Sequence, residues 1–128
     1  MNKKILLIDD DREDAEIFEE ALTEADDSAI LIYMDDPREA LDKLKKMHTE
    51  MPKIIFLDIN MPSMTGWDCL QEIKKDGTLQ HIPVIMYSTS SNQREAAMAA
   101  KLGAAAYLTK PHDYNELKSK LKCLLSPL

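Results

Sequence analysis

The sequence predicts an α/β protein in which five helices cover both faces of a parallel, doubly wound sheet of five strands. Short apolar runs alternate with helical patterns at intervals of roughly 25 residues, as successive βαβ units require. One run, residues 54–57, has four consecutive apolar residues and is typical of a strand buried on both faces. A chain of 128 residues, 45% hydrophobic and 30% charged, is long enough for one domain with its own core.

Five strands are expected where apolar or β-branched runs end in polar residues or turn signals. The predicted strands are residues 4–9, 30–34, 54–58, 84–87 and 105–109. Asp58 follows the most apolar of these runs, and the Met61-Pro62 step just beyond it cannot continue a strand.

The five predicted helices begin or end at recognisable signals. Asp11, with Asp14 three residues later, indicates the N-terminal cap of the first helix, in which Ala15, Phe18 and Leu22 have helical spacing. Residues 36–39 combine a capping Asp, a Pro and a Glu, and start the second helix. The third is expected from about 65–66 to 76, the fourth from 92–95 to 102 with Gly103 after it, and the last from Asp113 with Glu116 in capping-box position.

The overall charge and cysteine content exclude several classes of protein. The net charge is −7, with 23 acidic against 16 basic residues, which disfavours nucleic-acid binding. The apolar run at residues 5–8 is too short for a signal peptide or a membrane span, so we expect a cytoplasmic protein. Cys69 and Cys123 stand alone within helical patterns, and we expect free thiols that are buried or half-buried.

Polar side chains gather where the predicted strands end. Asp9 and Asp10 follow the first strand, Asp58 ends the third, Ser88 follows the fourth, and Lys110 follows the fifth. Because parallel strands present their carboxyl ends at one edge of the sheet, these side chains are expected to lie close together. Carboxylates brought together in this way repel one another, and oxygen ligands suit a hard cation such as Mg²⁺. A carboxylate, a Lys, a hydroxyl and Mg²⁺ are the components that phosphoryl transfer needs.

The motifs resemble the receiver domain of two-component response regulators, the CheY-like family. They are residues 5–11, residues 57–62 with Gly66, residues 83–88 and residues 103–111. The resemblance covers essentially the whole chain and implies a flavodoxin-like sheet of order 2-1-3-4-5. It also implies a single receiver domain over residues 1–128, of the stand-alone type with no output domain.

The resemblance implies a role for each charged residue at the sheet edge. Asp58 would be the phospho-acceptor, which attacks the phosphorus of a phospho-histidine donor. Asp10 would bind Mg²⁺ directly, together with Asp58 and the backbone carbonyl of Asn60, and Asp9 would bind it mainly through water. Lys110 would pair with Asp58 and then with the phosphoryl group. The protein would be a signalling switch that catalyses only its own phosphorylation and dephosphorylation.

The resemblance also implies a switch and a cis peptide bond. Ser88 would be the switch hydroxyl, and Tyr107 would swing inward when Ser88 moves to the phosphate. The Lys110–Pro111 bond is commonly cis in this family. The chain departs from the family pattern in having Ser88 for the commoner Thr, Thr89 for a small Ala, Ala106 for Gly and His112 for Phe.

The partners implied by the resemblance are proteins. A sensor histidine kinase or a phosphotransfer protein would donate the phosphoryl group, and residues 88–91 and 102–111 resemble stand-alone receivers that pair with phytochrome-type kinases. Output would pass to a protein target through the face formed by the fourth helix, the fifth strand and the fifth helix. Direct DNA binding and membrane attachment are not expected, whereas a homodimer remains open.

Other functions and simpler interpretations of the same residues stay open at this point. A haloacid-dehalogenase-like Mg²⁺-dependent phosphohydrolase with an aspartyl-phosphate intermediate has a second Asp two residues after its nucleophile, where this chain has Asn60. A flavin or nucleotide carrier needs a glycine-rich phosphate loop, and the chain has only three glycines. A degenerate receiver acting as a scaffold is disfavoured because the key positions are filled. Taken singly, Asp58 and Asp10 are also consistent with helix caps, Lys110 with a surface lysine, and Tyr107 with the core.

Overall fold

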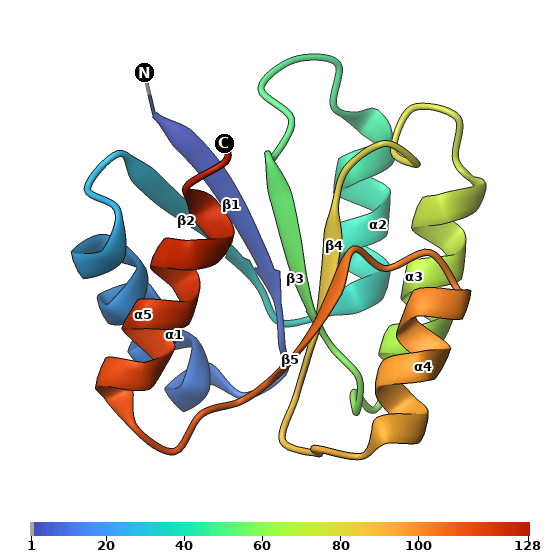
Figure 1. Ribbon diagram of the computed structural model, residues 1–128. Coiled ribbons are helices and arrows are strands. Elements are labelled where there is room, and N and C mark those ends of the chain that lie inside the picture. Colours follow the sequence, from blue (N-terminus) through green and yellow to red (C-terminus); the bar gives the residue numbers. More distant parts are fainter. Residues whose placement is uncertain (1) are drawn as a thin grey trace.

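The helices and strands alternate along the chain as the sequence predicts. The structure is a computed structural model that describes residues 2–128 (Figure 1). Its elements are β1 (Lys3–Ile8), α1 (Arg12–Ala25), β2 (Ala29–Met34), α2 (Pro37–Lys46), β3 (Ile54–Asp58), α3 (Gly66–Lys75), β4 (Val84–Ser88), α4 (Gln93–Lys101), β5 (Ala106–Thr109) and α5 (Tyr114–Leu125). No predicted strand boundary is wrong by more than one residue.

The five strands form one parallel sheet of order β2-β1-β3-β4-β5. The order implied by the resemblance is therefore confirmed. In the register of the three central strands, Ile8 lies beside Leu57, and Asp58 beside Tyr87. The register aligns the carboxyl ends of the strands at the lower edge of the sheet in Figure 1.

The sheet separates two hydrophobic cores. Leu6 and Ile8 of β1 pack on the side covered by α2, α3 and α4, whereas Ile5 and Leu7 pack on the side covered by α1 and α5 (Figure 1). This alternation follows from the two-residue period of a strand. On the α1 and α5 side, the ring of Phe18 packs edge-to-face against Phe56 and Tyr87, with centroids 5.0 and 5.5 Å apart. Both faces of the central strands are thus closed to solvent.

The helix α4 is bound to the core less extensively than the other helices. Ala99 is its single buried residue, whereas α1, α2 and α3 each bury four residues and α5 buries three. The side chain of Asn92 caps its first turn by accepting a hydrogen bond from the Arg94 amide at 2.8 Å. The helix is followed by Gly103 with φ of 98°, a backbone conformation that favours glycine.

The predicted helix starts are confirmed at α1 and α2 but only in part at α5. Asp11 accepts a hydrogen bond from the Asp14 amide at 3.1 Å, and Asp36 accepts one from the Arg38 amide at 3.0 Å. Asp113 is the N-terminal cap residue of α5 by position, but its side chain makes no capping hydrogen bond. The capping motif at Asp113 therefore predicts correctly where α5 begins, but the side-chain hydrogen bond that such a motif implies is not formed.

Two further expectations are wrong. Cys69 is buried as expected, but Cys123 is exposed. The reason is that Leu117, Leu121 and Leu125 form the buried face of α5 at four-residue spacing, and Cys123 lies off that stripe. The Lys110–Pro111 bond is trans, as are the other peptide bonds of residues 2–128.

Within residues 2–128, no helix combines the length and the apolar character that a membrane span requires.

Candidate phospho-acceptor site

Three carboxylates meet at the carboxyl edge of the sheet. Asp9 directly follows β1 and is fully buried, Asp58 ends β3 and is 7% exposed, and Asp10 is exposed. One carboxylate oxygen from each lies within 4.8 Å of the others. The three carboxylates lie close together because β1 and β3 are paired in parallel and end at the same edge of the sheet. The proximity predicted from the strand ends is confirmed for these three side chains.

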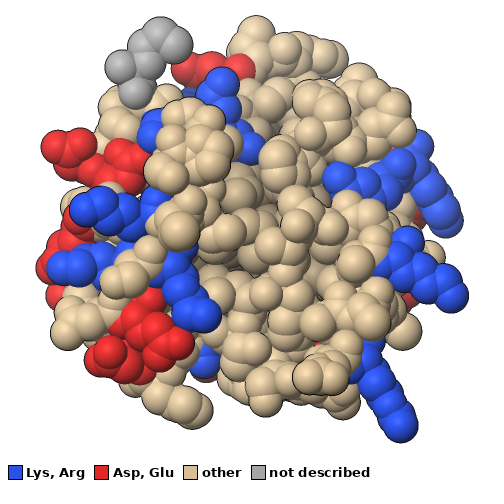
Figure 2. All heavy atoms as spheres, viewed as in Figure 1, with Lys and Arg blue, Asp and Glu red and all other residues tan. Residues whose placement is uncertain are grey.

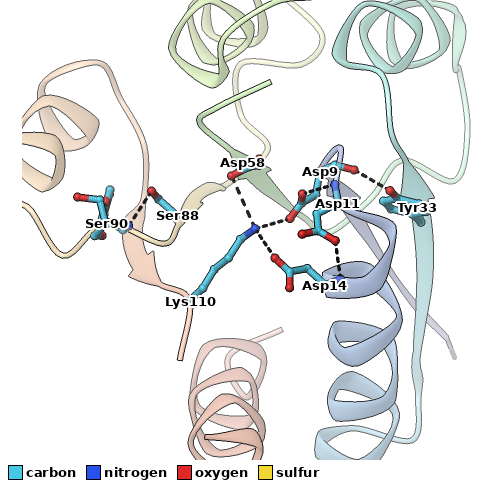
Figure 3. Close-up of polar contacts among 9 residues, drawn as sticks. Asp9, Asp11, Asp14, Tyr33, Asp58, Ser88, Ser90 and Lys110 are labelled. Carbon is cyan, nitrogen blue, oxygen red and sulfur yellow. Dashed lines mark hydrogen bonds and ion pairs between the residues drawn. The ribbon is translucent and has the colours of Figure 1, made fainter. Parts of the chain in front are cut away.

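The Lys110 ammonium lies among these carboxylates (Figure 3). It follows β5, and its Nζ atom is 2.9 Å from Asp9 Oδ2 and 3.8 Å from Asp58 Oδ1. Its third acidic neighbour is Asp14 of α1, whose Oδ2 atom is also 2.9 Å away. The same Nζ atom lies 5.2 Å from the centre of the Tyr87 ring, within the range of a cation–π interaction. The Lys110 side chain is only 11% exposed, so these contacts largely replace its solvent.

Burial and mutual repulsion shift the protonation of the cluster. Burial, with the nearby charges of Asp9 and Asp10, raises the pKa of Asp58 to about 7, against the lowering effect of Lys110. Burial also raises the pKa of Asp9, although the hydrogen bond from Lys110 opposes that shift. For Lys110 burial acts to lower the pKa, but the hydrogen bonds to Asp9 and Asp14 outweigh it, and the pKa is raised. Lys110 is therefore a permanent cation, whereas the negative charge on Asp58 is poorly compensated.

The loop that follows β1 is held by hydrogen bonds to Asp9. The Asp11 amide donates to Asp9 Oδ1 at 2.9 Å, while the Tyr33 hydroxyl, from the edge strand β2, donates to the Asp9 carbonyl at 2.7 Å (Figure 3). Because Lys110 donates to the other carboxylate oxygen of Asp9, both of its oxygens have a protein partner. Asp9 is thereby fixed in one orientation.

The loop that follows β3 requires a glycine at the start of α3. The Gly66 amide donates to the Ile59 carbonyl at 2.8 Å, which brings the helix start against the backbone of Asp58 and Ile59. A Cβ atom at position 66 would overlap the Asp58 carbonyl oxygen and would lie 2.8 Å from the Ile59 Cα atom. Gly66 therefore allows a close approach that fixes where Asp58 lies.

The donor set fits a divalent cation. Asp10 is exposed and makes no hydrogen bond or ion pair with the other residues in the range 2–128, which leaves its carboxylate available. Asp58 is buried with a raised pKa, so a cation beside it would relieve an unfavourable charge. Carboxylate and carbonyl oxygens without nitrogen or sulfur ligands match the preference of Mg²⁺.

The two predicted switch residues lie on the next strands and are joined through the loop before α4. Ser88, at the end of β4, is buried, and its Oγ atom accepts a hydrogen bond from the Ser90 amide at 3.2 Å (Figure 3). The Tyr107 hydroxyl of β5 is 2.7 Å from the Ser90 carbonyl and 2.8 Å from a carboxylate oxygen of Glu95 in α4. Ser90 thus connects Ser88 with Tyr107.

Three residues around this site were not predicted: Asp14, Tyr33 and Glu95. The sequence predicts Asp14 only as part of the α1 cap with Asp11, but its side chain pairs with Lys110, 96 residues away. Its position in the first turn of a helix that follows a strand is the signal that could have placed it near the sheet edge. Tyr33 and Glu95 each form a hydrogen bond with a residue of another segment, and no local sequence pattern identifies either contact.

A family model for the response regulator receiver domain matches residues 5–122. The chain therefore belongs to the response regulator receiver family. Members of this family act as phospho-acceptor switches of two-component systems, and this function is consistent with the acidic cluster and lysine at the sheet edge.

Individual relatives support the same assignment. The chain is 31% identical to the response regulator Rcp1 of Synechocystis, and the match covers 90% of this chain and 81% of Rcp1. It is also 31% identical to the probable transcriptional regulator ycf27 of Guillardia theta, covering 96% of this chain but 45% of that protein. The chain thus spans about half the length of some curated relatives.

Solved structures are similar over almost the whole chain. A phosphorylated cyanobacterial phytochrome response regulator, RcpA, has a TM-score of 0.88 and 31% identity, covering 100% of this chain and 97% of that one. The Mn²⁺-bound form of Rcp1 has a TM-score of 0.83 and 30% identity, covering 97% and 92%. Both likenesses therefore cover all or nearly all of the chain, including the residues of the candidate site.

Proposed function

We propose that Asp58 is the phospho-acceptor and that it takes the phosphoryl group from a phospho-histidine. An Asp58 carboxylate oxygen bonds to phosphorus as the phosphorus–nitrogen bond breaks, and the departing imidazole nitrogen keeps the electron pair. The observation that supports this role is the buried Asp58 carboxylate at the sheet edge, 3.8 Å from the Lys110 ammonium and beside two more carboxylates. The product is an aspartyl phosphate, and the protein acts only on its own phosphoryl group.

Asp10, Asp58 and the Asn60 carbonyl would hold Mg²⁺ directly, and Asp9 through water. Asp9 suits the indirect role because both of its carboxylate oxygens already accept protein hydrogen bonds. When bound, the ion would offset the carboxylate charge and stabilise the charge on the phosphoryl oxygens. The ammonium of Lys110 adds a fixed positive charge beside Asp58 and would bind a phosphoryl oxygen.

Ser88 and Tyr107 would transmit the change to the surface. We expect the Ser88 hydroxyl to turn toward the phosphoryl group and to lose its hydrogen bond from the Ser90 amide. Because the Tyr107 hydroxyl contacts the Ser90 carbonyl, movement of this loop would release Tyr107 as well. The α4-β5-α5 face would then change shape.

A protein target would bind the α4-β5-α5 face. Figure 2 shows this face with uncharged residues in the middle, Lys and Arg on both sides, and Asp and Glu among them on the left. Met98 of α4 is 46% exposed, and a hollow of about 200 Å³ between β5 and α5 is lined by Tyr107 and Leu124. These features suit a partner with an apolar centre and acidic surroundings, and a second copy of the chain is an alternative occupant.

The donor would be a phytochrome-type histidine kinase or its phosphotransfer protein. This choice is supported by similar structures described as a phytochrome response regulator, a bacteriophytochrome response regulator and a response regulator in red light signalling. We expect the reaction in the cytoplasm, where histidine kinases draw on ATP.

Intact mass after incubation with acetyl phosphate and Mg²⁺ tests the acceptor. The expected result is a labile gain of one phosphoryl group in the wild type, with no gain in Asp58→Asn or after chelation of the metal. The same preparation should not hydrolyse an added phosphomonoester catalytically. A wild type that is folded, loaded with Mg²⁺ and unmodified even by a phospho-histidine protein would contradict the proposal and favour a scaffold role. Catalytic turnover that is lost in Asp58→Asn would instead indicate a phosphohydrolase.

A further inference from the structure

We propose that Asp14 is a positioning residue that holds the Lys110 ammonium away from Asp58 until Asp58 is phosphorylated. This inference rests on the proposed roles of Asp58 and Lys110, and adds a regulatory residue to that site. Asp14 would set how readily the lysine is released to a phosphoryl group, and hence how strongly the site binds one.

The geometry of the ammonium supports this role. Lys110 Nζ is within hydrogen-bond distance of Asp14 and Asp9, at 2.9 Å from each, but is 3.8 Å from the nearer Asp58 oxygen. Figure 3 shows the Lys110 side chain extending between Asp58 on one side and Asp14 on the other. The lysine is therefore bound toward α1 although the proposed acceptor lies next to it.

Asp14 is itself held in place. It lies in the first turn of α1, and its amide donates to the Asp11 side chain at 3.1 Å. Its carboxylate is 36% exposed, whereas that of Asp9 is fully buried. Solvent can therefore replace Lys110 at Asp14 more easily than at Asp9, so Asp14 is the contact that the lysine can give up.

The expected effect of removing Asp14 follows from this competition. A phosphoryl group on Asp58 brings additional negative charge to the site and attracts the ammonium, which must then give up Asp14. In Asp14→Asn the ammonium gives up no ion pair when it moves to the phosphoryl group, so phosphorylation becomes more favourable than in the wild type. A partly exposed ion pair of this kind should alter anion affinity about two- to fivefold.

Beryllium fluoride, an analogue of the phosphoryl group, provides the test. We would measure its affinity for the full chain at fixed Mg²⁺ by calorimetry and by the fluorescence of Trp67. The variants are Asp14→Asn, Asp14→Glu, which keeps the negative charge at this position, and Glu13→Gln as the matched control. Glu13 lies in the same helical turn and is exposed, and its side chain makes no hydrogen bond or ion pair within residues 2–128.

The expected result is about two- to fivefold tighter binding in Asp14→Asn, with wild-type affinity in Asp14→Glu and Glu13→Gln. Loss of a merely structural contact would weaken binding or leave it unchanged, and thermal unfolding reports any loss of fold. If the wild type binds beryllium fluoride and Asp14→Asn binds it no more tightly, the inference is wrong. The inference is also wrong if Glu13→Gln shows an equal increase in affinity. Either result leaves the proposed function standing. No binding in any folded variant, including the wild type, overturns both.

Discussion

The charges around Lys110 do not balance in the absence of a metal ion. One ammonium faces the carboxylates of Asp9, Asp14 and Asp58 within 4 Å, and a carboxylate oxygen of Asp10 lies within 4.8 Å of oxygens of Asp9 and Asp58. Asp58 is the carboxylate with the longest contact to Lys110 and has a pKa of about 7. Its ionisation is therefore unfavourable in the folded protein, and this cost should be measurable as stability.

Replacing Asp58 with Asn should stabilise the metal-free protein at neutral pH. As the pH rises from 4 to 7, the unfolded chain ionises Asp58 first because its ordinary pKa is 3.8, whereas the folded protein keeps the proton. The wild type therefore loses stability over this interval relative to Asp58→Asn, by up to about 1.4 kcal/mol per pH unit, and the difference becomes constant above pH 7. Urea unfolding of both proteins between pH 4 and 8 measures it.

Two comparisons make this prediction specific. Asp42→Asn, at an exposed position of α2, changes the net charge equally and is the matched control for the substitution itself. Addition of Mg²⁺ at pH 7.5 should narrow the gap between wild type and Asp58→Asn, because a bound cation offsets the repulsion. A constant difference from pH 4 to 8 would show that Asp58 ionises normally in the folded chain.

Individual residues were predictable where the topology alone determines their position. Asp9, Asp10, Asp58 and Lys110 each follow or end a strand, and parallel strands bring such positions together without detailed packing. Asp14 and Glu95 lie on helices, where orientation depends on how each helix packs against the sheet. Their contacts with Lys110 and Tyr107 join distant parts of the chain and have no local sequence signal.

At the scale of elements, the start of α3 is the most constrained junction near the site. Gly66 is the first residue of α3, and its backbone lies directly against that of Asp58 and Ile59. Any side chain at this position must displace either the helix or the end of β3. Because β3 is buried along its whole length, neither can move freely.

Gly66→Ala should destabilise the protein by about 1–3 kcal/mol, as expected for overpacking next to a buried strand. The matched control is Gly77→Ala, where a Cβ atom would meet nothing within 4 Å, and we expect a change of about 0.5 kcal/mol or less. Urea denaturation compares the two. Equal effects of the two substitutions would mean that the loop after Asp58 adapts without cost.

The boundaries of the elements were largely predictable, but their arrangement was less so. Caps such as Asp36, the following Pro37 and the positive φ of Gly103 determine where helices begin and end through local interactions. The alternation of strands and helices also determines that the sheet is parallel. It leaves open which strands are neighbours, and the order β2-β1-β3-β4-β5 was predicted only from the family resemblance.

At the scale of the whole molecule, the site is connected to the α4-β5-α5 face by a short series of hydrogen bonds. Ser88 accepts from the Ser90 amide, and the Ser90 carbonyl accepts from both Tyr107 and Thr109 of β5. Tyr107 also contacts Glu95 in the first turn of α4. The loop between β4 and α4 is thus fastened to β5 by two side chains from the same face of that strand.

Tyr107→Phe should loosen this connection without removing the acceptor. Loss of the hydroxyl removes the contacts with Ser90 and Glu95, which we expect to lower the local stability of residues 90–101 by about 1 kcal/mol. Amide hydrogen exchange in that segment should accelerate about fivefold, with little change in β1 and β3. Acetyl phosphate should still modify the variant. Unchanged exchange in α4 would show that the hydroxyl does not restrain the helix.

The shallow attachment of α4 has a thermodynamic consequence. Its one buried residue is an alanine, and burial of a single methyl group is worth about 0.8 kcal/mol, close to thermal energy. Two positions of this helix can therefore differ little in free energy, and a modest preference of a ligand for one of them changes their populations. Such coupling is reciprocal. A target protein that favours the displaced helix would therefore also favour phosphorylation at equilibrium, so the target would help to determine what fraction of the protein carries the signal.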